Sequence, residues 1–179
     1  MKKRFAIIVI LILTMSLFGC GDKKTPSEKD STVASTAVNG KKIAEFKFVY
    51  GAPAYYIEYK VSFSDPVTVF IKESMPTDEP FGPVPGYYQG TYGLDEETAS
   101  KITELYDKYE LSKWNGFDEK STITDGGGFE LKITFKNGEA LRAKGYSKYP
   151  DGYPDFYKEL EEIFRSYRDR MIDEGSSET

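Results

Sequence analysis

Residues 129–143 read FELKITFKNGEALRA, and this stretch decides the fold class. Apolar residues recur there at every second position, which is the pattern of strands with one buried face. They are Phe129, Leu131, Ile133 and Phe135 before the Asn-Gly pair, and Leu141 and Ala143 after it. Two such runs separated by a short polar segment predict a β-hairpin.

The length of the hairpin loop follows from the same pattern. A turn of only two residues, Asn137 and Gly138, would place Ile133 opposite a charged residue and mix the two faces. A loop that also includes Lys136 places Ile133 opposite Leu141. The pattern therefore predicts a type I turn with a G1 bulge, in which φ is positive at Gly138 but not at Asn137.

The elements around this hairpin give the fold class. We predict strands over residues 42–50, 55–63 and 67–72, a proline-rich loop over 73–86, a short strand over 87–92, and helices over 96–111 and 154–173. Asp95 is the expected N-cap of the first helix. Strands, helix, hairpin and helix in this order predict an α+β fold: an antiparallel sheet, built from a meander and a hairpin, with two helices packed on one face.

The first twenty residues have the pattern of an export signal. Lys2, Lys3 and Arg4 form a basic start, and an apolar stretch follows over residues 5–18. As a helix this stretch would be about 21 Å long, which is too short for a hydrocarbon core of about 30 Å. A secretory signal therefore fits better than a spanning helix.

Residues 17–20, LFGC, resemble the lipobox of bacterial lipoproteins. Leu17 stands three positions before Cys20, and the small residue Gly19 stands directly before it. The resemblance implies that the chain is cleaved before Cys20, and that Cys20 carries a diacylglyceryl thioether which anchors the protein on the extracytoplasmic side of the cell membrane. The alternative is an ordinary signal peptide with a coincidental cysteine.

The composition along the chain predicts four segments. We expect a signal peptide over residues 1–19 and a flexible tether, rich in Ser, Thr, Lys and acidic residues, over 20–39. A single domain is expected over 40–174 and a disordered tail over 175–179. Fully extended, the tether would reach about 65 Å, so the domain would stay close to the membrane.

Charge and missing residue types exclude several functions. Cleavage before Cys20 would remove Lys2, Lys3 and Arg4. The remaining chain would have 21 of the 24 basic residues and all 29 acidic ones, a formal net charge of −8. Such a chain is a poor partner for nucleic acid. The chain has no His and only one Cys, so Ser-His-Asp and Cys-His triads and His-based zinc sites are excluded. We expect no cofactor and no metal.

Carboxylates leave one enzymatic alternative. A pair of acids working as general acid and nucleophile or base would make a glycan hydrolase acting on the cell wall. The candidates are Glu73, Asp78, Glu79, Asp118, Glu119 and Asp125. With so many acids in the chain, solvated surface carboxylates are the simpler interpretation.

Aromatic residues supply the candidate ligand contacts. They make up 15% of the chain, and Tyr combines an apolar ring with a polar tip, which suits binding surfaces. Phe81 lies in the proline-rich loop, and Tyr87 and Tyr88 follow that loop directly. These residues are predicted either to contact a ligand or to form a lid over the core.

Residues 95–164 are similar to a group of uncharacterised lipid-anchored proteins from Gram-positive bacteria. The resemblance is carried by Trp114, Gly116, Phe117, Asp125, Gly126, Phe129, Leu131, Ile133, Asn137, Gly138, Ala143, Gly145, Pro150, Gly152, Tyr153, Phe156, Leu160 and Phe164. It implies a shared fold. Together the patterns predict a non-enzymatic binding module near the membrane, with an envelope protein or a wall ligand as partner.

Overall fold

The computed structural model describes residues 37–38, 40–76, 86–122 and 126–176, and the structural statements below refer to these. The strands are β1 (Ala37–Val38), β2 (Lys41–Ala52), β3 (Tyr55–Ser62), β4 (Thr68–Ser74), β5 (Tyr87–Gly93), β6 (Asp118–Lys120), β7 (Gly128–Phe135) and β8 (Ala140–Tyr146). The helices are α1 (Glu96–Lys108), the short 3₁₀ helix η1 (Leu111–Trp114) and α2 (Tyr153–Ser176).

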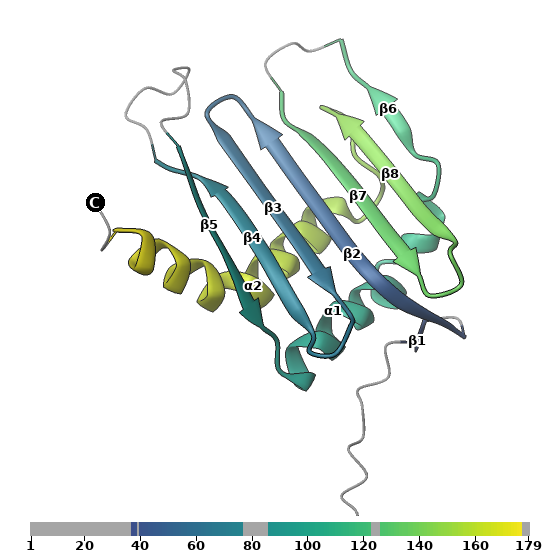
Figure 1. Ribbon diagram of the computed structural model, residues 1–179. Coiled ribbons are helices and arrows are strands. Elements are labelled where there is room, and N and C mark those ends of the chain that lie inside the picture. The colour runs from purple at the N-terminus through teal and green to yellow at the C-terminus, as the bar shows by residue number, and fades with distance from the viewer. Residues whose placement is uncertain (1–36, 39, 77–85, 123–125, 177–179) are drawn as a thin grey trace, which may run out of the picture. The chain divides into compact units, whose positions relative to one another are not determined.

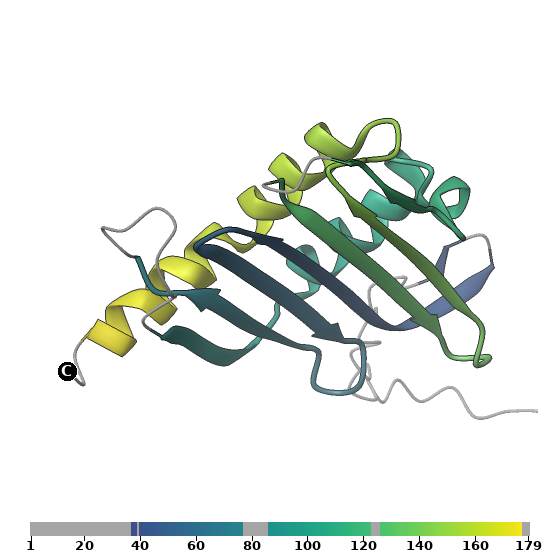
Figure 2. The same ribbon diagram turned by 90° about the horizontal axis from the view of Figure 1, so that it is seen from above.

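The strands form one sheet with the order β5-β4-β3-β2-β7-β8-β6, and β1 pairs with β2 beside it. Helices α1 and α2 cover the same face of this sheet, as Figures 1 and 2 show. The predicted α+β fold, with a mostly antiparallel sheet and two helices on one face, is therefore confirmed.

Alternation along the strands places the core between the sheet and the helices. Tyr59 of β3 stacks on Phe164 of α2 with 4.6 Å between ring centroids. Phe135 of β7 meets Tyr106 of α1 edge to face. In β2 the register shifts between Ile43 and Glu45, and this bulge puts Ile43 on the same buried face as the later apolar residues of the strand.

The hairpin loop has the predicted length. Ile133 pairs with Leu141, and the loop consists of three residues between Phe135 and Glu139. Phe135 N–H donates to Glu139 C=O at 2.9 Å, and φ is 86° at Gly138. Asn137 is not among the residues with positive φ, so the predicted G1 bulge is confirmed.

Some boundaries differ from the prediction. Strand β4 runs through Glu73 and Ser74, where the sequence predicts the start of the loop, because Glu73 is held from the helix side by Arg168. Helix α1 ends at Lys108, and the positive φ of 47° at Glu110 separates it from η1. Strand β6 was not predicted because its three residues, Asp-Glu-Lys, have no apolar alternation. It pairs with β8 in parallel.

The two ends of the folded part also differ from the predicted domain boundaries. Residues 37–38, predicted in the tether, form β1, where Val38 is buried. Helix α2 continues to Ser176, past the predicted end of the domain. The predicted signal peptide and the rest of the tether lie outside the described residues. No helix in the described part of the chain is both long enough and apolar enough to span a membrane.

Candidate functional site

Among the carboxylates proposed for a glycan hydrolase, Glu73 lies far from Asp118 and Glu119, which are successive residues of β6 and both line the depression described below. Glu73 belongs to β4 and points to the helix side of the sheet, while Asp118 belongs to β6 at one end of the sheet. Strands β3, β2, β7 and β8 lie between them, which corresponds to about 24 Å at the usual strand spacing. Paired glycosidase carboxylates lie about 5–9.5 Å apart. Asp78, Glu79 and Asp125 lie outside the described residues.

Glu73 has a structural partner instead. Arg168 of α2 donates to both carboxylate oxygens, with Nε 2.9 Å from Oε2 and Nη2 in contact with Oε1. Burial by itself would lower the pKa of the Arg168 guanidinium. The hydrogen bonds to Glu73 and the negative charge of Glu73 outweigh the effect of burial, so the pKa is raised. Tyr55 contacts the same carboxylate at 3.3 Å. This network fastens α2 to the sheet on its helix side.

Tyr87 and Tyr88, which the sequence predicts as ligand contacts, lie on different faces of the sheet. Tyr87 and Tyr88 are successive residues of β5 and so point to opposite faces. Tyr87 is 43% exposed and meets Tyr56 edge to face, with Lys72 Nζ 4.1 Å from the centre of its ring. Tyr88 is half-buried near Gly175 at the end of α2. Cys20 and Phe81 lie outside the described residues.

Tyr87 belongs to the face of the sheet that carries no described helix, which we call the open face. Its side chains form rows across the strands, because residues directly opposite each other in neighbouring strands share a face. The mixed row alternates in charge over most of the sheet. Its members, in order, are Gln89, Lys72, Glu58, Val49, Glu130, Lys144 and Asp118.

Charges of the mixed row are compensated by a neighbour within the row and by Lys47, which stands two residues from Val49 on β2. Lys144 Nζ lies 3.1 Å from Asp118 Oδ2. Glu58 accepts from Tyr56 at 2.7 Å and pairs with Lys47 at 2.9 Å. Burial by itself would raise the pKa of the Glu58 carboxyl. The hydrogen bond from Tyr56 and the interaction with Lys47 outweigh the effect of burial, so the pKa is lowered overall. The row itself holds two lysines and three acidic residues, a formal net charge of −1.

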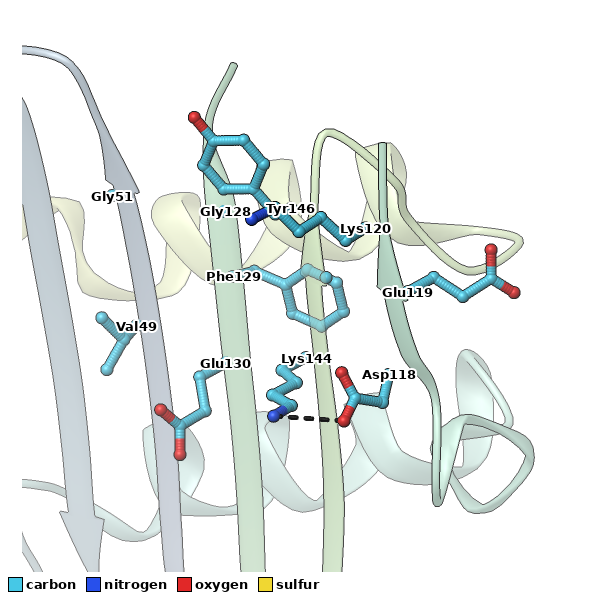
Figure 3. A pocket seen from close by; sticks show the side chains of 11 residues that line it. Val49, Gly51, Asp118, Glu119, Lys120, Gly128, Phe129, Glu130, Lys144 and Tyr146 are labelled. Carbon is cyan, nitrogen blue, oxygen red and sulfur yellow. Dashed lines mark ion pairs between the residues drawn. The ribbon is translucent and has the colours of Figure 1, made fainter. Parts of the chain in front are cut away.

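A shallow depression of about 450 Å³ lies next to the mixed row, and Figure 3 shows its lining. Gly51 of β2 and Gly128 of β7 are directly opposite each other, so no side chain rises from the sheet at this point. Tyr146 and Lys120 stand beside the gap, with Lys120 Nζ 5.6 Å from the centre of the Tyr146 ring. The hollow is open and follows from two adjacent glycines.

A second row of the open face has a single sign of charge. This basic row consists of Lys60, Lys47, Lys132 and Arg142, which stand directly opposite one another on β3, β2, β7 and β8. The sequence alone does not predict this row. Alternation along each strand shows that these residues point away from the core, but only the register between strands shows that they are neighbours.

In the part of the chain that the structure describes, no group of three or more Asp, Glu, Cys or His residues could hold a metal ion. Comparison with models of known protein families finds no match for the chain, and comparison with curated proteins finds none either.

Proposed function

We propose that this chain is a lipid-anchored, extracytoplasmic binding domain, and that it binds its ligand on the open face of the sheet. The anchor would be Cys20, which follows a basic start, an apolar stretch and the small residue Gly19. The domain would thus work close to the outer side of the membrane.

The observation that carries the binding role is the division of the sheet into two faces. Helices α1 and α2 both lie on one face, and no described element lies on the other (Figure 2). That other face presents aligned charged rows, the exposed ring of Tyr87 and the depression beside Tyr146. A flat surface with this many fixed polar groups is suited to binding and offers little enclosure for catalysis.

The anchor is tested by the Cys20→Ser variant of the full chain in its own host. We expect the wild-type chain to take up labelled palmitate and to sediment with membranes, and the variant to lose both properties. Ser27→Ala, a change of similar size outside residues 17–20, is the control and should keep both. A Cys20→Ser chain that is still labelled and membrane-bound would contradict the anchor.

The binding face is tested by acetylating lysines in intact envelopes and in the full chain purified in detergent. If the open face is occupied in the envelope, Lys60, Lys132 and Lys144 should react less there than in the purified protein. Lys101 and Lys158 on the helices are the internal controls and should react equally in both. Equal reactivity of all five lysines in the two samples would exclude the open face as the binding surface.

A further inference from the structure

The basic row is the least compensated charge cluster of the open face. Lys47 pairs with Glu58 at 2.9 Å, and Lys60 pairs with Glu45 at 3.2 Å. Within the described residues, Lys132 and Arg142 have no ion pair. These two side chains stand directly opposite each other, and Lys47 is the other cross-strand neighbour of Lys132.

Such an arrangement is unfavourable for the folded domain by itself. Like charges directly opposite each other on neighbouring strands repel, and this chain has more acidic than basic residues from which partners could be drawn. The mixed row, two residues further along the same strands, shows that alternating charges are possible on this sheet. The basic row is therefore the place where an anion from outside would complete the charge pattern.

We propose that the basic row binds a linear phosphodiester polymer of the cell envelope, laid across strands β3, β2, β7 and β8. This inference rests on the proposed function, since it names the ligand of the open face. Lys and Arg side chains are the usual partners of phosphate groups, and Arg binds them with two parallel hydrogen bonds. The four cations span about 14 Å at the spacing of neighbouring strands.

The surroundings of the row favour a narrow chain over a flat anionic surface. Neighbouring rows lie about 6.7 Å away along the strands, since each is two residues distant. One of them contains Glu58 and Glu130, and the other contains Glu45. A polymer one chain wide could follow Lys132 and Arg142 without crossing a neighbouring row, whereas a sheet of anionic lipid headgroups would also lie over these carboxylates and be repelled by them.

The test measures binding of the full chain, reconstituted in phosphatidylcholine vesicles, to poly(glycerol phosphate). Lys132→Gln/Arg142→Gln should weaken the binding about tenfold or more at low salt, and should lower the slope of log K against log salt by about 1.4. The matched control Lys158→Gln/Arg165→Gln removes the same two residue types from exposed positions of α2, and should leave affinity and slope unchanged. Circular dichroism of both variants checks that they are folded.

Two further ligands distinguish the sources of phosphate. A single-stranded oligo(dT) with the same number of phosphates should bind more weakly than poly(glycerol phosphate), and replacing some phosphatidylcholine by phosphatidylglycerol should not displace the polymer. Three outcomes would each overturn the proposal. The wild type and the Lys132/Arg142 variant could bind the polymer with equal affinity, oligo(dT) could bind more tightly than the polymer, or phosphatidylglycerol could displace the polymer. If the open-face lysines are protected in envelopes but the polymer does not bind, this inference fails and the proposed function stands.

Discussion

Arg168 of α2 and Glu73 of β4 form a two-point ion pair between residues 95 positions apart in the chain. The Glu73 side chain is 8% exposed and the Arg168 side chain 21% exposed, so both charges are largely removed from water. The pair lies on the helix side of the sheet, and it holds the C-terminal half of α2 against the end of β4, close to where β3 begins at Tyr55 and β5 begins at Tyr87. It is thus a support of the sheet whose other face we propose as the binding surface.

Breaking this pair from one side should destabilise the domain strongly. Arg168→Met leaves the Glu73 carboxylate buried without a counter-charge, and we expect the free energy of unfolding to fall by about 3 kcal/mol. Arg165→Met removes an exposed arginine of the same helix, whose ion pair in the described part of the chain is with the exposed Glu162, and should cost less than about 0.5 kcal/mol. Urea unfolding followed by circular dichroism measures both values.

The double variant Glu73→Met/Arg168→Met separates the ion pair from simple packing. Because it removes both buried charges together, it should regain most of the stability lost in Arg168→Met. If Arg168→Met is no less stable than Arg165→Met, the pair does not stabilise the docking of α2.

Gly138 should be required for the hairpin loop for a backbone reason alone. Its φ of 86° is left-handed, and a Cβ built on it meets no atom within 4 Å. Gly138→Ala should therefore lower the free energy of unfolding by about 1 kcal/mol through backbone strain. Gly93→Ala is the matched control, because that site is equally spacious but has no left-handed φ. It should be neutral or slightly stabilising, and equal losses in the two variants would contradict the strain argument.

Two lysines on the open face should respond with opposite signs to the same substitution. Lys132→Gln removes repulsion from Lys47 and Arg142, so thermal unfolding should show a gain of about 0.5 kcal/mol at low salt. Lys144→Gln removes attraction to Glu130 and Asp118, so a loss of about 0.5 kcal/mol is expected. Both changes should shrink in high salt because these side chains are solvent-accessible. A loss for Lys132→Gln would show that the basic row is not under repulsion.

The domain should lose stability in alkali through its buried tyrosines. Burial, and then the charge of Glu73, raises the pKa of Tyr55 to about 12, whereas an unfolded tyrosine has a pKa near 10. The folded chain holds this proton more tightly, so the contribution is complete below about pH 10 and is lost as the pH rises toward about 12.

Unfolding free energies measured across that pH range should fall less steeply in Tyr55→Phe than in the wild type. Tyr87→Phe, which removes an exposed tyrosine, is the control and should keep the wild-type slope. An unchanged slope in Tyr55→Phe would show that this hydroxyl does not couple folding to pH.

The sequence by itself determined much of the architecture. Alternation in residues 129–143 specified both strands of the hairpin, and the need to keep Ile133 and Leu141 on one face selected the three-residue loop. Helical spacing likewise located α1 and α2. These features are local, because a strand or a helix repeats its buried face within a few residues.

Only the tertiary structure decided which distant residues become neighbours. The partnership of Glu73 with Arg168, the parallel pairing of β6 with β8 and the alignment of Lys60, Lys47, Lys132 and Arg142 all depend on the order and register of strands far apart in the chain. A shift of one residue in any strand would turn its side chains to the other face. Alternation thus placed the lysines outside the core, and the packing of the whole sheet placed them in one row.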